Sequence, residues 1–199
     1  MFIKMKIFKG LIKRAYTGAG LIVGHLGEGI LLADNHWVIW LEKECIPKKA
    51  LAAIIELTGE IPEQGQVFRS TSAGNQIAIP ENETWNINKH WEDTKVKYTV
   101  SNIQYRASEQ TTYRMLQEQN TREVKMINNI FVDGIDENEI DREIETRPKG
   151  PRAIDANSQV VYWKNEVCTL AAGLIMPKEE EQTSFLKLLE NVELIPQKE

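Results

Sequence analysis

The order of apolar and polar residues near the start of the chain predicts several short strands. Residues 2–8 alternate apolar side chains with Lys4 and Lys6, which is typical of a half-buried strand. Glycines then separate short apolar runs at 21–23 and 30–32, and this spacing indicates turns between strands. We therefore expect the first part of the chain to belong to an antiparallel sheet.

A hairpin, a helix and a second hairpin are expected next. Asn35-His36 separates two apolar runs and suits a tight turn. Pro47 suits the first position of a helix, because its missing N–H costs nothing there. Residues 51–57 supply the apolar stripe of that helix, and Gly59 is placed to end it. Residues 67–79 then predict a hairpin around a Ser-Ala-Gly-Asn turn.

The middle of the chain changes character twice. Residues 85–105 carry spaced aromatic and apolar residues, including Trp85 and Ile87, and we expect them to be mainly extended. Residues 109–126 lack Gly and Pro and place apolar residues at near-helical spacing, which predicts a mostly polar helix. Residues 133–151 are dense in charge and contain two prolines, so we expect an exposed loop.

The two ends of the chain share an order of landmarks. Residues 34–62 and 155–196 each run through a Trp-containing apolar segment to a cysteine, then to a proline and a Leu-rich segment. The paired landmarks are Trp40 with Trp163, Cys45 with Cys168, Pro47 with Pro177, and Pro62 with Pro196. Repeated units bury their apolar faces by packing on each other. Two cysteines are too few for a disulfide scaffold, so we expect both to be reduced and buried in equivalent places.

Together these patterns predict an α+β protein, mainly antiparallel sheet with two or three helices, built from two related strand–helix–strand halves. We expect one domain over residues 1–199, since this length can bury one good core. Its first half is 1–105, its polar helix and charged loop are 106–151, and its second half is 152–199. No run reaches the roughly 20 apolar residues that a membrane-spanning helix needs, so we expect a cytoplasmic protein without membrane association.

Motifs for catalysis or cofactors do not stand out. The early glycines lack the spacing of a dinucleotide or phosphate loop, and the three histidines show no metal-ligand spacing, so we expect neither cofactor nor metal. The only arrangement suited to a nuclease is Glu123-Val124-Lys125 with Asp93 upstream. We therefore expect a protein that is not an enzyme, with a metal-dependent nuclease as a minor alternative.

Basic residues are the more informative candidates. The net charge of −5 argues against a surface that is basic throughout, but it allows a local basic patch. Residues 1–27 hold five basic residues and no acidic one. We expect Lys4 and Lys6 to share one strand face, and other cations to cluster around the polar helix, where they can contact phosphates. The members of that second cluster are Arg106, Arg114, Arg122 and Lys125. An ordinary charged surface is the alternative.

The repeated unit resembles the building block of the DNA sliding clamps. The segments that carry the resemblance are 46–57, 61–62, 66–68 and 76–79 for one unit, and 176–177, 185–189 and 192–194 for the other. In that family, strand–helix–strand motifs place their helices against the duplex inside a ring. The resemblance implies DNA encirclement without catalysis, with Lys48, Lys49 and Lys187 on the DNA-facing helices. It also implies a homo-oligomer, because this chain is too short for a ring.

The function expected from the sequence is therefore that of a clamp-like accessory protein, which binds duplex DNA or replication partners such as a polymerase. The DNA-binding candidates are Lys4, Lys6, Lys48, Lys49, Arg106, Arg114, Arg122, Lys125 and Lys187. The alternative is a protein–protein interaction or inhibitor module without DNA binding. In that case the tryptophans, which can also stack on bases, would contribute to a protein surface.

Overall fold

A computed structural model describes residues 1–77 and 85–196, and it confirms the α+β class with a mainly antiparallel sheet. The described residues form five α-helices, where two or three were expected. The helices are α1 (Met5–Thr17), α2 (Lys48–Thr58), α3 (Ile87–Glu92), α4 (Asn129–Asp133) and α5 (Glu180–Leu189). The strands are β1 (Leu21–Leu26), β2 (Gly29–Ala33), β3 (Trp37–Glu42), β4 (Val67–Thr71), β5 (Gly74–Ile77), β6 (Val96–Arg106), β7 (Thr112–Glu118), β8 (Val124–Asn128), β9 (Lys149–Ala153), β10 (Val160–Lys164) and β11 (Cys168–Ile175).

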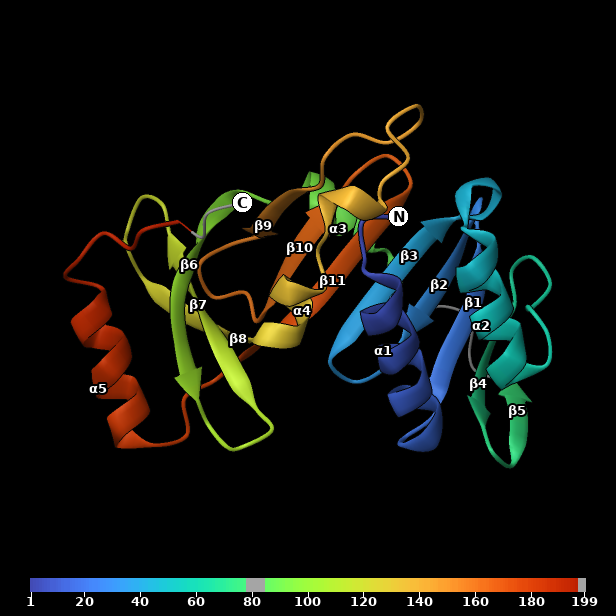
Figure 1. Ribbon diagram of the computed structural model, residues 1–199, viewed down its shortest axis with the longest axis horizontal. Helices are drawn as coiled ribbons and strands as arrows, with labels where there is room; N and C mark the ends of the chain where they lie inside the picture. Colours follow the sequence, from blue (N-terminus) through green and yellow to red (C-terminus); the bar gives the residue numbers. More distant parts are fainter. Residues whose placement is uncertain (78–84, 197–199) are drawn as a thin grey trace.

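The sheet has an open part and a closed part, which meet at β11 (Figure 1). Strands β1 to β5 form the open part, in the order β3-β2-β1-β4-β5. Strands β6 to β11 form a closed circuit, in which every strand pairs with two others of the circuit. β11 pairs with β3 over Cys168–Ala172, with β10 over Thr169–Gly173, and with β8 at Leu174 and Ile175.

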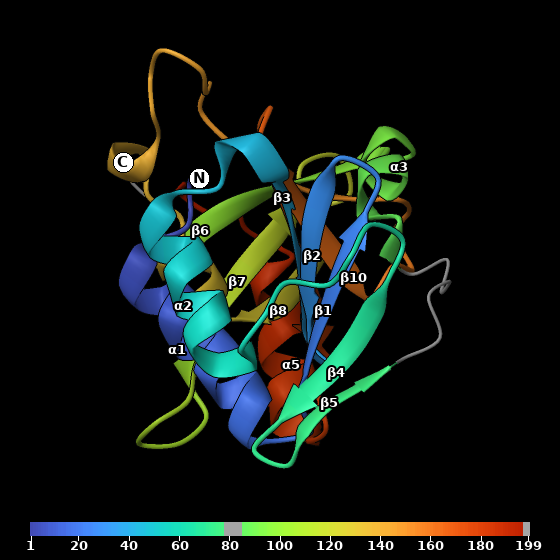
Figure 2. The same cartoon turned by 90° about the vertical axis from the view of Figure 1, so that its right-hand side faces the viewer.

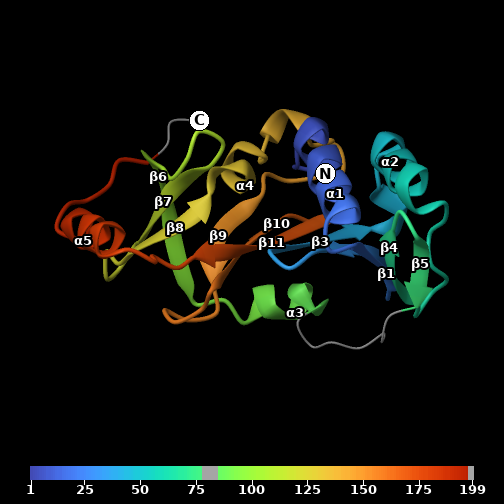
Figure 3. The same ribbon diagram turned by 90° about the horizontal axis from the view of Figure 1, so that it is seen from below.

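Helices cover both faces of this sheet. Successive residues of a strand point to opposite faces. Leu116 of β7 accordingly packs in the main core with residues of α1 and α2, whereas its neighbour Met115 packs in a second core with Leu186 of α5. A third small core forms where Trp91 of α3 meets Tyr162 of β10. Figure 3 shows α1, α2 and α4 on one side of the sheet and α3 on the other.

The strand predicted for residues 2–8 is wrong, because this segment enters helix α1. The apparent alternation covers only a few residues. A longer helical repeat overrides it, since Phe8, Leu11, Ile12 and Ala15 follow the i, i+3, i+4, i+7 spacing and are all buried. Lys4 and Lys6 therefore do not share a strand face.

The polar helix predicted for residues 109–126 is also wrong, because β7 and β8 occupy this region. Both faces of β7 are covered, so even Arg114, Gln117 and Glu118 are buried. Buried polar side chains that are held by hydrogen bonds give a strand the composition of a solvated helix. The polar residues at the end of β7 thus reflect internal hydrogen bonding, whereas the exposed polar residues of the segment lie in the turns on either side of the strand.

Other local predictions are confirmed. β2 and β3 form the hairpin around Asn35-His36, and β4 and β5 form the next one. Gly59 ends α2 in the left-handed conformation, as predicted, whereas Pro47 is the N-cap, one residue before the first helical position that was predicted for it. The region of Ile87 is helix α3 and not a strand, because the side chain of Asn86 caps it by accepting a hydrogen bond from the Lys89 N–H. Residues 78–79 of the second hairpin lie outside the described residues.

The repeat of landmarks is only partly reflected in the fold. Both segments run hairpin then helix, as β2-β3-α2 and as β10-β11-α5. The paired landmarks do not match, since Trp40 and Cys45 lie in β3 and the 3₁₀ turn Lys43–Cys45, whereas Trp163 and Cys168 lie in β10 and β11. Both cysteines are free, but Cys168 is buried and Cys45 only half-buried.

Gly29 provides a test of the packing in the open part of the sheet. A Cβ at this position would lie 2.2 Å from Cε2 of the Trp40 indole. We expect Gly29→Ala to lower the free energy of unfolding by about 1–3 kcal/mol, as overpacking does, measured by urea denaturation. In a Trp40→Leu background the same change should cost less. Simple additivity of the two changes would show that this close approach is not the cause.

Candidate nucleic-acid interface

The exposed face of α1 carries four basic side chains, Lys6, Lys9, Lys13 and Arg14, which we call the basic stripe. Their spacing of i, i+3, i+7 and i+8 places them on one side of the helix. The opposite side is fixed in the main core by buried apolar residues such as Phe8 and Ile12. Burial of one face therefore orients the four cations toward solvent together.

Helix α2 adds two more cations beside the stripe. α1 and α2 pack against each other, and Figure 2 shows them side by side over the open part of the sheet. Lys48 and Lys49 are exposed in the first turn of α2, which has no acidic residue and no capping side chain. The N-terminus of a helix is already partly positive, so these lysines strengthen a potential that attracts anions.

Along the sequence, the basic stripe lies in a stretch that contains no acidic residue. All 29 acidic residues lie after residue 27, whereas the first 27 residues hold five basic ones. Within the part of the chain that the structure describes, none of the four stripe residues takes part in a salt bridge. An acidic protein therefore presents a local basic surface.

Sequence reasoning missed most of this surface. It selected Lys6, but not Lys9, Lys13 or Arg14, because the predicted strand ended at residue 8 and no helix was predicted there. The spacing of the four buried apolar residues of α1 was the signal that could have found them. Lys4, which was selected, lies outside the stripe: it is half-buried at the N-cap, and its backbone N–H donates to the Gly134 carbonyl at 2.8 Å.

Arg114 has an internal role and does not belong to an exposed cluster. It is 4% exposed. Its Nε donates to Asn129 Oδ1 at 2.8 Å, its Nη1 to the Ser101 carbonyl at 3.3 Å, and its Nη2 to Asp133 Oδ1 at 3.3 Å. These bonds tie β7 to β6 and α4, so the guanidinium cannot reach a phosphate while the fold is intact.

The remaining predicted cations are scattered. Arg106 ends β6, Arg122 lies in the turn after β7, and Lys187 is exposed on α5, which Figure 1 shows at the opposite end of the molecule from α2. Lys125 is partly buried and is neutralised by Glu123, with 2.5 Å between Nζ and Oε1. Of the predicted set, only the exposed residues Lys6, Lys48 and Lys49 lie on the neighbouring helices α1 and α2.

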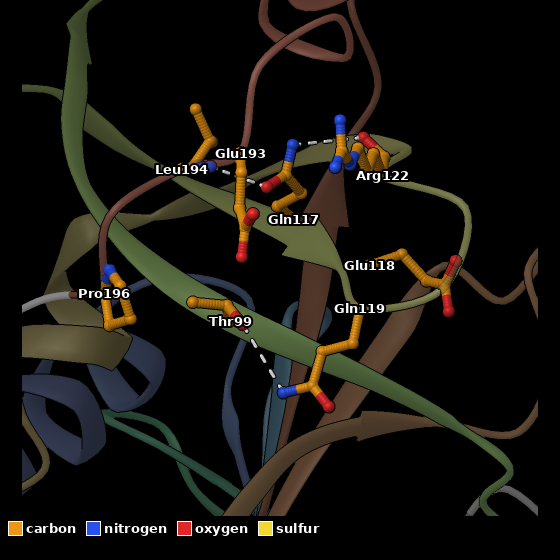
Figure 4. A pocket seen from close by; sticks show the side chains of 8 residues that line it. All are labelled: Thr99, Gln117, Glu118, Gln119, Arg122, Glu193, Leu194 and Pro196. Atoms are coloured by element: carbon orange, nitrogen blue, oxygen red, sulfur yellow. Dashed lines mark hydrogen bonds between the residues drawn. The ribbon is translucent and has the colours of Figure 1, made fainter.

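A pocket of about 330 Å³ lies at the other end of the protein, between β6, β7 and the segment after α5 (Figure 4). It is lined by Thr99, Gln117, Glu118, Gln119, Arg122, Glu193, Leu194 and Pro196. The Gln117 amide is used internally: Oε1 accepts from the Leu194 N–H and Nε2 donates to the Val192 carbonyl, both at 2.8 Å. This lining pairs no nucleophile with a histidine base, so it does not suggest covalent catalysis.

The carboxylate of Glu118 is also held by hydrogen bonds within the protein. Burial raises its pKa, but hydrogen bonds from Thr121 and Asn120 outweigh burial and hold the pKa below its usual range. Glu118 therefore stays ionised and fixes the turn between β7 and β8. A general acid would need the opposite shift.

None of the five tryptophans and none of the proposed nuclease residues lies on α1 or α2. Trp37 and Trp163 are in the main core, and Trp40 packs against Gly29. Trp91 is a buried residue of α3, and Trp85 lies just before that helix. The described residues contain no group of three His, Cys, Asp or Glu side chains that could hold a metal ion. Asp93 follows α3, and Glu123 pairs with Lys125.

Comparison with known proteins gives no relative: no protein-family model, no curated protein and no solved structure matches this chain. Among the described helices, none combines the length and the apolar character that crossing a bilayer requires.

Tyr98 of β6 is a buried residue of the main core, and its hydroxyl group allows a test of the packing there. Its hydroxyl is buried and has no hydrogen-bond partner among the described residues. Burial, followed by the charges of Glu123, Glu118 and Asp155, raises the pKa of Tyr98 to about 12. The hydroxyl therefore ionises near pH 10 in the unfolded chain but only near pH 12 in the folded protein, so the free energy of unfolding falls as the pH rises from 10 toward 12.

We expect Tyr98→Phe to raise the free energy of unfolding at pH 7 by about 1 kcal/mol, because it removes an unpaired buried hydroxyl. The difference in the free energy of unfolding between the variant and wild type should be larger at about pH 11, because only wild type is destabilised there by ionisation of Tyr98 in the unfolded chain. Urea denaturation at both pH values measures it. A gap that narrows at high pH would contradict the assignment.

Proposed function

We propose that the protein is a non-enzymatic, clamp-like accessory protein that binds duplex DNA through the basic stripe of α1 and the two lysines at the start of α2. The observation that carries the proposal is the stripe: four exposed cations on one helix face, without a salt-bridge partner among the described residues. Phosphates are the ligand that such a surface attracts most strongly.

Binding through this surface is independent of base sequence. Three of the four stripe residues are lysines, which contact phosphates as point charges, and only Arg14 has the bidentate geometry that reads a guanine edge. Phosphate contacts position a protein on the duplex without selecting its sequence. This behaviour suits an accessory protein that stays on DNA wherever it is loaded.

The arrangement of α1 and α2 supports a clamp-like mode of binding. Two adjacent helices on one face of an antiparallel sheet form the kind of surface that a sliding clamp turns toward the duplex. α5 lies at the far end and packs on the other face, so Lys187 is not part of the interface. Encirclement would require several copies of the chain, and the outer surfaces would remain for replication partners.

The salt dependence of binding tests this proposal. With four to six phosphate contacts, log K for a duplex should fall with log[salt] with a slope of about −4 to −5. The triple variant Lys9→Gln, Lys13→Gln, Arg14→Gln should bind weakly and flatten the slope by about 3 units, as fluorescence anisotropy measures. The matched control Lys187→Gln removes an exposed helix cation at the far end. The proposal would be refuted if Lys187→Gln lost as much affinity for the duplex as the triple variant, or if wild type did not bind the duplex at low salt.

A second function, protein–protein interaction, is favoured by a separate observation. Leu188, Val192 and Ile195 are 70%, 50% and 73% exposed around the end of α5. Exposed apolar side chains that gather in one region are typical of contact surfaces. This surface lies away from the basic stripe, so the two functions are compatible.

The double variant Leu188→Ser, Ile195→Ser tests the second function. We expect it to abolish recovery of a stoichiometric partner in a pull-down, because burial of these side chains would drive the contact. The triple variant of the basic stripe should still recover the partner. A partner lost only with the stripe variant would show that nucleic acid bridges the two proteins.

A further inference from the structure

Gly10 lies in the middle of α1 and has no evident role within the protein. It is exposed, and a Cβ built on it would meet no atom within 4 Å. Its φ angle is not among the positive ones, so an alanine would fit without strain. Glycine is one of the least favourable residues in a helix interior. Neither packing nor backbone conformation therefore accounts for a glycine here.

Other glycines differ from Gly10 in this respect. Gly29 is required by the Trp40 ring, Gly20 combines a positive φ with a close approach by Arg69, and Gly59 ends α2 with a positive φ. Among the described helices, Gly10 is the only glycine in a helix interior. Among these glycines, Gly10 is thus the one that neither a close contact nor a positive φ angle requires.

Gly10 is surrounded by the basic stripe. Lys6 and Lys9 precede it, and Lys13 and Arg14 follow it on the same face. With a rise of 1.5 Å per residue, Lys6 and Arg14 lie about 6 Å along the helix axis on either side. The centre of the basic surface is thus a position without a side chain, between two pairs of cations.

We propose that Gly10 is the point of closest approach between α1 and the sugar–phosphate backbone of a bound nucleic acid. The inference rests on the proposed function and adds the geometry of contact. A missing Cβ lets a ligand backbone approach a helix backbone closely. The phosphate strand crosses α1 at Gly10, and the two pairs of cations contact phosphates on either side. A shorter separation strengthens each of these attractions.

Two substitutions at Gly10 test the inference, measured against a 20-base-pair duplex at low salt. Gly10→Ala should raise the melting temperature and weaken binding by about two- to fivefold. Gly10→Gln adds bulk without charge and should also stabilise the helix, yet it should weaken binding by tenfold or more. The control Ser184→Gln places the same side chain at an exposed position of α5 and should leave affinity unchanged.

The outcomes separate this inference from the proposed function. If Gly10→Gln binds the duplex as tightly as wild type while the triple variant of the stripe has lost binding, the close approach is refuted and DNA binding stands. If neither variant differs from wild type, the proposed function fails as well. A melting temperature that drops in Gly10→Ala would show that the glycine serves the fold, and that result would also overturn the inference.

Discussion

The antiparallel ladder between β3 and β11 is the interaction on which the rest of the structure depends. Within the described residues it is the only strand pairing that joins the open part of the sheet to the closed circuit. It runs from Cys168 opposite Leu41 to Ala172 opposite Trp37, and both ends are buried. Since α1 and α2 pack over the open part, this ladder helps to hold their basic surface in place relative to the circuit, together with the backbone hydrogen bonds that join Phe2 and Lys4 to residues 134–136.

Polar residues in this protein belong to two physical classes, which composition does not separate. The lysines of the basic stripe are exposed and have no salt-bridge partner among the described residues, so their charge acts on solvent and ligands. Arg114 and Gln117 are buried, and each is satisfied by several hydrogen bonds that join neighbouring elements. Net charge therefore says little about where a basic surface lies. Its position depends on which basic side chains are exposed and which are held by hydrogen bonds or salt bridges.

Sequence patterns predicted the elements whose signals are local. Pro47 and Gly59 bound α2 because capping depends on the residues at the ends themselves, and Asn35-His36 makes a turn for the same reason. β7 was missed because its polar residues are stabilised by partners that are distant in the sequence, such as Gln117 by Leu194. The basic stripe was found only in part, since the position of each cation depends on the secondary structure assigned to α1.

The position of β11 in the chain has a consequence for how the protein forms. This strand lies in the centre of the sheet, yet only α5 and a short tail follow it among the described elements. During synthesis the open part is complete about 90 residues earlier, so the edge of β3 stays unpaired until Cys168–Ala172 emerges. Contacts of such large sequence separation form slowly. A nascent chain would hold β3 as a bare edge, open to pairing with another chain, and this interval is where misassembly would begin.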